Sequence, residues 1–300
     1  MVIENEVKPI PFFSIVIPTL NEEKYLPTLL SDLKNQTYKD FEVIIVDAKS
    51  VDKTVKKAEE FKDKFTNLTI LTSDKKNVSY QRNLGTKNAI ADWLVFMDAD
   101  NRLPFYFLQG IKFRLEMLQP NILSTWIEPD TNNKRDKATT LLINIYIDIQ
   151  KNTNKPRILE AMLCIKKNSF LKLKGFNEKL LVNEGSDLLS RALKKKMKFY
   201  FVKDPKYICS FRRVRTEGVL KTIRNTAQIE MARLSNIHIS KEKLKYLYPM
   251  DGGMYFELDK NTGSRIEKLI YKIFKYEASI KREKEKLIGK VFRMLKKGNT

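Results

Sequence analysis

Four short apolar runs alternate with amphipathic segments in the first hundred residues, and this alternation constrains the fold more than any other feature. The apolar runs cover residues 14–18, 41–47, 68–72 and 93–98. The segments between them carry apolar residues at helical spacing and cover residues 21–34, 52–65 and 79–90. A repeated order of strand, helix and strand is typical of parallel sheets with right-handed crossovers. The sequence therefore predicts an α/β fold with a mostly parallel central sheet flanked by helices.

Polar residues follow three of the predicted strands. The first strand runs into residues 19–22, the second ends at Asp47, and the fourth runs into Asp98 and Asp100. Because ligands bind outside the carboxyl ends of parallel strands, we expect these residues to open onto one crevice. Two carboxylates at a strand end suit Mg²⁺ or Mn²⁺, which usually complete their coordination with phosphate oxygens of a substrate. We therefore predict that Asp98 and Asp100 hold one of these cations.

The pattern is looser after Asp100. We expect two helices and two strands in the next hundred residues, with the helices at 104–118 and 184–196 and the strands at 121–127 and 160–166. The apolar residues 141–149 fit either a helix or a strand. No alternation remains after about residue 206, where the expected helices cover 216–247 and 265–297. We predict an α/β domain over residues 1–205 and a basic helical extension over residues 206–300.

Positive charge is concentrated in the C-terminal third. The chain carries a net charge of +21, and residues 206–300 contribute +13 of it, with 23 Lys and Arg against 10 Asp and Glu. Such an excess predicts an anionic partner, which could be a nucleic acid, a lipid surface or nucleotide phosphates. A solvated lysine-rich surface is the alternative.

The segment 265–297 interleaves apolar residues with Lys and Arg. A basic amphipathic helix of this kind is a candidate for binding an anionic membrane surface. Packing onto the α/β domain, or onto a second copy in a homodimer, is an alternative of equal weight. Two cysteines, Cys164 and Cys209, and a charged N-terminus without an apolar stretch predict a cytoplasmic protein, with peripheral contact on the cytoplasmic face of the membrane.

Four motifs, in this order, resemble those of the family 2 glycosyltransferases, which are inverting enzymes that use nucleotide-diphosphate sugars. They are the opening strand and turn at 14–22, an Asp-x-x-Ser-x-Asp-x-Thr element at 47–54, an Arg-Asn-x-Gly element at 82–85 and Asp-x-Asp at 98–100. The resemblance covers roughly residues 12–215. It implies the GT-A fold, a Rossmann-like sheet flanked by helices, here with a C-terminal helical extension.

The resemblance also implies which residues contact the sugar nucleotide. In the family the first Asp of the second motif meets the nucleotide base, and the arginine of the third lies near the nucleotide. Carried over to this chain, the contacting residues are Pro18, Thr19, Asn21, Glu22, Asp47, Arg82 and Asp98, with Asp98 also serving the metal. For Asp47 the alternative is a turn carboxylate, and for Arg82 it is an ion pair with a local acidic group.

A fifth motif departs from the family pattern. Family members usually carry Glu-Asp-x-Asp-Leu-x-x-Arg, in which an acidic residue is the general base. Here residues 184–191 keep Glu184, Asp187 and the arginine, but Gly185 replaces the Asp most often assigned as the base. We therefore expect either Glu184 or Asp187 to be the catalytic base, with a solvated helix start as the alternative for each.

Adjacent arginines further along resemble a Ser-x-Arg-Arg…Gly element of some family members. Arg212 and Arg213 are expected to contact the diphosphate or an anionic acceptor, or else to form a basic surface loop. The Gln-x-x-Arg-Trp motif of processive synthases is absent from the sequence, which argues against polymerisation.

These observations lead to a functional prediction. We expect a metal-dependent inverting glycosyltransferase that moves a sugar from a UDP- or GDP-sugar to a hydroxyl of a glycan or lipid-linked glycan. One alternative acceptor is a polyprenyl or dolichyl phosphate, which is already an anion and needs no base. An alternative of another class is a nucleotide- or nucleic-acid-binding protein on the same scaffold. Nucleic acid is disfavoured because residues 1–205 lack basic clusters interleaved with aromatic residues.

Overall fold

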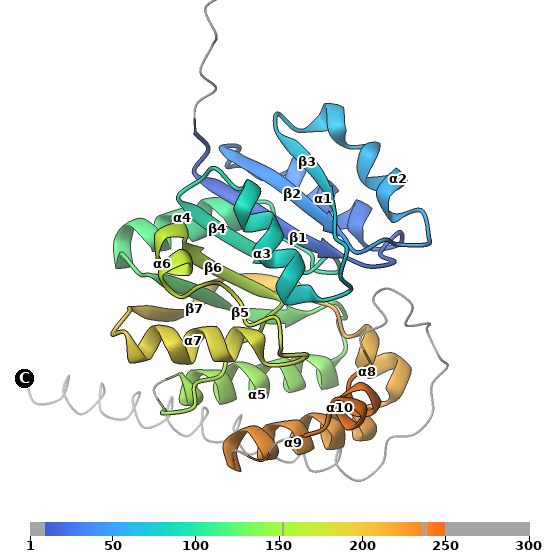
Figure 1. Ribbon diagram of the computed structural model, residues 1–300, viewed down its shortest axis with the longest axis vertical. Helices are drawn as coiled ribbons and strands as arrows, with labels where there is room; N and C mark the ends of the chain where they lie inside the picture. Colours follow the sequence, from blue (N-terminus) through green and yellow to red (C-terminus); the bar gives the residue numbers. More distant parts are fainter. Residues whose placement is uncertain (1–9, 152, 236, 238, 250–300) are drawn as a thin grey trace, which may run out of the picture.

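The computed structural model describes residues 10–249 apart from 152, 236 and 238. The described residues form one seven-stranded mixed sheet with helices on both faces (Figure 1). From one edge of the sheet to the other, the strands follow the order β3 (Leu68–Thr72), β2 (Phe41–Asp47), β1 (Phe13–Thr19), β4 (Trp93–Met97), β6 (Met162–Lys166), β5 (Ile122–Pro129) and β7 (Phe199–Cys209). The predicted segment 265–297 lies outside the described residues. No described helix combines the length and the apolar character needed to cross a membrane.

The first half of the sheet is parallel, as the sequence predicts. Its strands are β1 (Phe13–Thr19), β2 (Phe41–Asp47), β3 (Leu68–Thr72) and β4 (Trp93–Met97). The intervening helices are α1 (Leu26–Lys34), α2 (Thr54–Glu59) and α3 (Val78–Asn88), followed in the case of α2 by the 3-10 turn Lys62–Lys64. The first two helices are shorter than predicted because polar turn residues occupy the positions between each strand end and the helix. Asn21, for example, adopts a left-handed backbone conformation with φ 55°.

The second half of the sheet contains β5 (Ile122–Pro129), β6 (Met162–Lys166) and β7 (Phe199–Cys209). β6 runs antiparallel to β4, with Met162 opposite Met97, so the beginning of β6 lies at the carboxyl end of β4. The sequence prediction missed β7, an edge strand whose only neighbour among the described strands is β5. Its polar interior, Lys203 to Lys206, hides the strand pattern. The sheet therefore extends past the predicted boundary at residue 205.

The remaining described helices are α4 (Phe107–Leu118), α5 (Lys134–Gln150), α6 (Lys167–Lys172), α7 (Glu184–Lys194), α8 (Arg212–Glu217), α9 (Val219–Ser235) and α10 (Lys241–Leu247). The segment 141–149, which fitted a helix or a strand, is part of α5. The single helix predicted over 216–247 is instead α8, α9 and α10. Gly218 separates the first two, with φ 80°.

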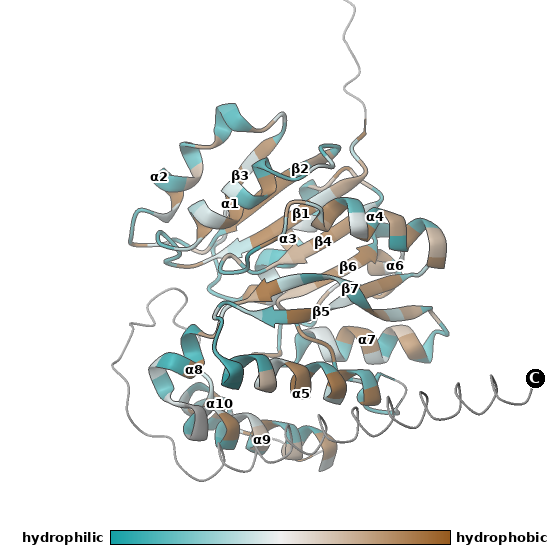
Figure 2. Cartoon of the chain, turned by 180° about the vertical axis from the view of Figure 1, so that it is seen from behind, coloured by the Kyte–Doolittle hydropathy of each residue, from teal (hydrophilic) through white to brown (hydrophobic). Residues whose placement is uncertain are grey.

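The core has two parts, one on each face of the sheet, and the strands between them are strongly apolar (Figure 2). Residues of α1, α2 and α4 pack on one face, and residues of α3, α6 and α7 pack on the other. α3 packs closely on β1. A Cβ atom added to Gly85 of α3 would lie only 2.4 Å from Cγ1 of Val16. The first turn of α3 lies beside the carboxyl ends of β1 and β2, where Gln81 forms hydrogen bonds to the carbonyls of Thr19 and Val46.

Candidate active site

The crevice at the carboxyl edge of the sheet begins at Asp47. This carboxylate is 2% exposed and lies beside Thr19, its neighbour in the sheet register. Its oxygens accept hydrogen bonds from the Thr19 hydroxyl at 2.8 Å, the Ser50 amide at 2.8 Å and the Ser50 hydroxyl at 2.5 Å. Asp47 therefore closes the turn after β2, and its contact with the nucleotide stays a prediction.

The turns after β1 and β2 are tied to each other. The Asn21 side chain accepts a hydrogen bond from the Val51 amide at 2.9 Å, and the Glu22 amide donates to the Thr54 hydroxyl at 2.7 Å. Pro18, also expected to contact the nucleotide, is a buried residue within β1. The structure thus brings the predicted nucleotide-contacting turn and the second motif together, with several of their polar groups already satisfied internally.

Gln81 joins the two strand ends from α3. Its side-chain amide donates to the carbonyl of Thr19 at 2.9 Å and to the carbonyl of Val46 at 2.7 Å. Asn77 directly precedes this helix and caps it, because its side chain accepts a hydrogen bond from the Tyr80 amide at 2.8 Å. Gln81 lies outside the four sequence motifs, although it directly precedes the Arg-Asn-x-Gly motif.

Arg82 pairs with local acidic groups, the alternative that the sequence left open, and its contact with the nucleotide stays a prediction. Its guanidinium is 1% exposed and binds the carboxylates of Asp98 and Glu184, each at 2.8 Å. A further hydrogen bond of 2.9 Å goes to the backbone carbonyl of Glu160. A buried charge requires such partners, because an unpaired ion in the interior is very costly. Arg82 therefore holds together β4, α7 and the segment before β6.

A second ionic group lies at Asp100. Arg212 of α8 forms two hydrogen bonds of 2.8 Å with the Glu22 carboxylate, and its Nε lies 3.1 Å from Oδ2 of Asp100. The same guanidinium stacks on the Tyr25 ring, 4.7 Å from its centroid. Burial raises the pKa of Glu22 to about 7, although Arg212 acts to lower it. This cluster connects the turn after β1 with the end of β4 and with the segment beyond the sheet.

Arg213, the second arginine of the pair, has different contacts from Arg212, and its contact with an anionic ligand stays a prediction. Its guanidinium binds the Glu217 carboxylate at 3.0 Å and the Pro249 carbonyl at 2.8 Å, and lies 3.7 Å from the centroid of the Tyr248 ring. The reason is local, because adjacent residues at the start of a helix project in different directions. Arg212 thus contacts the carboxylates of Glu22 and Asp100, whereas Arg213 contacts α8 and the segment after α10.

Asp98 and Asp100 offer the donor chemistry of a Mg²⁺ or Mn²⁺ site. In the described residues each uses one carboxylate oxygen for its arginine, Oδ1 of Asp98 for Arg82 and Oδ2 of Asp100 for Arg212. The described chain contains no cluster of three or more acidic, histidine or cysteine ligands. Two carboxylates with substrate oxygens are a usual arrangement for these cations, so the residues present fit the predicted metal. Burial raises the pKa of Asp98, an effect that a nearby cation would oppose.

Both predicted base candidates begin α7. Glu184 is 5% exposed and paired with Arg82, and burial raises its pKa to about 7, with the nearby Glu160 carboxylate adding to the effect. Asp187 is paired with Arg191 at 2.8 Å, and Arg191 is anchored by a 2.8 Å hydrogen bond to the Gly175 carbonyl. Each candidate thus has a cationic partner.

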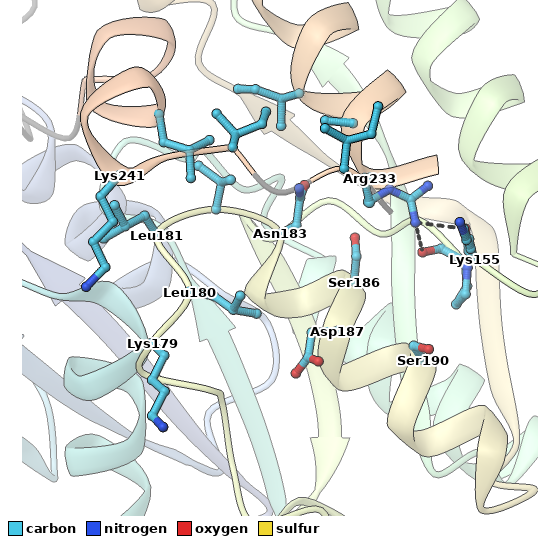
Figure 3. Close-up of a pocket in the computed structure, with 17 residues that line it drawn as sticks. Lys155, Lys179, Leu180, Leu181, Asn183, Ser186, Asp187, Ser190, Arg233 and Lys241 are labelled. Carbon is cyan, nitrogen blue, oxygen red and sulfur yellow. Dashed lines mark hydrogen bonds between the residues drawn. The ribbon is translucent and has the colours of Figure 1, made fainter. Parts of the chain in front are cut away.

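A cavity of about 440 Å³ lies between α7, α9 and α10 (Figure 3). Ser186, Asp187 and Ser190 line it from α7, and Arg233 lines it from α9, with a 2.9 Å hydrogen bond to the Lys155 carbonyl. The other lining side chains are mostly apolar or cationic, among them Leu180, Leu181, Ile229, Lys179 and Lys241. The cavity therefore combines apolar walls, positive charge and one carboxylate.

Comparison with known proteins identifies the family. The sequence model of glycosyl transferase family 2 matches residues 14–179. The chain belongs to this family. The match confirms the predicted resemblance over the segment that contains the first four motifs.

Two relatives illustrate the range of similarity. The chain is 41% identical over 92 residues to a dolichyl N-acetyl-alpha-D-glucosaminyl phosphate 3-beta-D-2,3-diacetamido-2,3-dideoxy-beta-D-glucuronosyltransferase of Methanococcus voltae, but this match covers only 29% of each chain. It is 25% identical over 276 residues to an uncharacterized glycosyltransferase of Haemophilus influenzae, covering 89% of this chain and 92% of the relative.

Solved structures confirm the predicted GT-A fold class. Staphylococcus aureus TarS 1-349 in complex with UDP has a TM-score of 0.54 and 19% identity, covering 79% of this chain and 70% of TarS. Mannosyltransferase PcManGT from Pyrobaculum calidifontis, in complex with GDP-Man and Mn²⁺, has a TM-score of 0.58 and 18% identity, covering 81% of this chain and 70% of that chain. At these identities the likeness concerns the fold.

Proposed function

We propose that this protein transfers a sugar from a UDP- or GDP-sugar to an acceptor hydroxyl, with inversion at the anomeric carbon. The observation that carries the proposal is the meeting of Asp98, Asp100 and Arg212 at the carboxyl edge of the sheet. That edge is where α/β folds bind their ligands. Membership of glycosyl transferase family 2 supports the reaction class, and the UDP and GDP-Man complexes of TarS and PcManGT support a nucleotide-sugar donor.

Asp98 and Asp100 would hold Mg²⁺ or Mn²⁺ together with the diphosphate of the donor. The bound cation would supply Lewis-acid stabilisation of the charge that develops on the departing phosphate. Arg212 adds a positive charge beside Asp100, and the buried Arg82 positions Asp98 through an ion pair. The proposed contacts of the nucleotide are the turn at 18–22 and Asp47. To bind the nucleotide, Asp47 would have to replace some of its hydrogen bonds within the protein by hydrogen bonds to the ligand.

The cavity beside α7 is the proposed acceptor site. Its apolar walls and cationic rim suit a lipid-linked glycan better than a free sugar. The lipid chain would contact the apolar walls, and the anionic linking group would contact the lysine and arginine side chains. The same cationic side chains also fit a second candidate acceptor, a polyprenyl or dolichyl phosphate. Its specific support is Gly185, which removes the carboxylate that a hydroxyl acceptor needs and a phosphate acceptor does not.

A titration of UDP- and GDP-sugars with and without Mn²⁺ tests the donor. Asp100→Asn should abolish metal-dependent turnover without unfolding the protein. Asp92→Asn is the matched control, because Asp92 is an exposed carboxylate at the opposite end of β4. Wild-type turnover by Asp100→Asn would exclude Asp100 from the metal site. Salt-dependent binding of nucleic acid without any sugar-nucleotide turnover would favour the nucleic-acid alternative.

A cytoplasmic location, a homodimer and peripheral contact with an anionic membrane through residues 265–297 also remain proposals. Sedimentation with anionic and neutral liposomes tests the membrane contact in the full-length chain. A chain truncated after residue 264 should lose the binding to anionic liposomes and keep its affinity for the nucleotide.

A further inference from the structure

The space above Gly185 is filled by another acidic side chain. A Cβ atom added to Gly185 would lie 2.7 Å from Cγ of Glu160 and 3.2 Å from Cγ2 of Ile158. Real Cβ atoms essentially never approach a neighbour as closely as 2.7 Å, so a side chain at position 185 and the Glu160 side chain in its present place exclude each other. The glycine that interrupts the acidic motif is thus the residue that admits Glu160.

The fold brings Glu160 to this position through the antiparallel strand β6. Glu160 lies two residues before β6, and the amide of Asp98 donates to the carbonyl of Ala161 at 3.0 Å. The backbone carbonyl of Glu160 accepts from Arg82 at 2.9 Å. Its carboxylate oxygen Oε1 lies 3.4 Å from the amide nitrogen of Ser186 and 3.3 Å from the Ser186 hydroxyl oxygen. Ser186 also lines the cavity beside α7, so Glu160 contacts a residue of the cavity wall.

Glu160 differs from the two other carboxylates around the start of α7. Glu184 is buried and paired with Arg82, and Asp187 is paired with Arg191. Glu160 is only half-buried and forms no salt bridge within the described part of the chain. Its two hydrogen bonds to Ser186 are long, and only one of its carboxylate oxygens takes part in them. Of these three carboxylates, Glu160 is therefore the one that no salt bridge between described residues holds in place.

We propose that Glu160 is the general base of the transfer, supplied by a different element in place of a carboxylate at position 185. The assignment rests on the proposed function with a hydroxyl acceptor. In the step, the acceptor O–H gives its proton to the Glu160 carboxylate while the acceptor oxygen bonds to the anomeric carbon. The bond from that carbon to the diphosphate oxygen breaks, and its electron pair leaves with the nucleoside diphosphate.

Steady-state transfer by the full-length protein tests the assignment. Glu160→Gln retains an oxygen that can accept from Ser186 but lacks basicity, so kcat should fall by about 10²–10⁴-fold, the usual contribution of a positioned base. The donor dissociation constant, measured by titration, should stay within about twofold because the donor is bound elsewhere. Glu116→Gln, which changes an exposed glutamate on α4, is the matched control and should keep wild-type kcat.

Moving the carboxylate back onto α7 separates a chemical role from a packing role. Glu160→Ala removes the Cγ atom that blocks position 185, so Glu160→Ala/Gly185→Asp should recover at least about tenfold of the kcat lost in Glu160→Ala. Equal kcat in these two variants would assign the loss to packing and overturn the proposal. Near-normal kcat in Glu160→Gln would overturn it as well, with the proposed transfer intact. Absence of transfer by the wild-type protein would instead overturn the proposed function and this assignment with it.

Discussion

Arg82→Met is the most informative test of how the site is held together. Arg82 is 1% exposed, and the substitution leaves two carboxylates without their cation. Removing one partner of a buried ion pair typically costs about 3–5 kcal/mol. Asp98 has a side chain that is 37% exposed and can regain water, whereas the Glu184 side chain is 7% exposed and cannot. We therefore expect Arg82→Met to lower the free energy of unfolding by about 3 kcal/mol at pH 8, the lower end of this range. Most of this loss should come from the unpaired charge of Glu184.

The loss of stability in Arg82→Met should be larger at high pH than at low pH. Burial raises the pKa of Glu184 from an ordinary value of 4.5 to about 7, and Arg82 opposes this increase. Between these two values the folded state binds more protons than the unfolded state, so stability falls as pH rises through that window. Without Arg82 the pKa rises further, and each additional unit costs about 1.4 kcal/mol above the window. At pH 5 Glu184 is protonated in both proteins, and the difference between them should be smaller.

Urea denaturation at pH 5 and pH 8, followed by tryptophan fluorescence, measures both effects. Arg82→Met/Glu184→Gln should regain at least half of the loss at pH 8, because the buried charge is gone. Arg102→Met serves as the control: Arg102 pairs with Asp32 but is 49% exposed, and such pairs contribute at most about 1 kcal/mol. A loss below about 1 kcal/mol for Arg82→Met, or an equal loss at both pH values, would refute the reasoning.

Three further predictions concern single positions. Gly85→Ala should lower the free energy of unfolding by about 1–3 kcal/mol, because the new methyl group would lie 2.4 Å from Val16, and a thermal melt indistinguishable from wild type would contradict this. Asp47→Ala should weaken nucleotide binding by about 1–3 kcal/mol in calorimetric titration, whereas unchanged affinity would limit Asp47 to closing its turn. Arg212→Ala should strengthen Mn²⁺ binding in the absence of nucleotide, since the guanidinium no longer competes for Asp100, and should lower kcat; weaker Mn²⁺ binding would show that no such competition exists.

The parallel half of the fold could be predicted because each of its elements is written in a continuous stretch of sequence. Strands β1, β2 and β4 are fully buried, and their apolar runs end in polar residues. The carboxyl ends of parallel strands necessarily share one edge, so the meeting of Thr19, Asp47 and Asp98 followed from the order of the elements. The edge strand β7 could not be found in this way, since only three of its eleven residues are buried and its middle is polar.

Sequence alone determined the fold class, the family and the edge of the sheet where the acidic residues gather, because local periodicity and short motifs carry that information. Only the tertiary structure decided what each charged residue contacts. Arg82 turned inward to Asp98 and Glu184, Arg212 reached Glu22 and Asp100, and Glu160 came to stand over Gly185. Each of these contacts joins segments far apart in the chain, and a buried charge selects its partner by which opposite charge the packing brings within reach. Local sequence patterns do not predict which opposite charges the packing brings together.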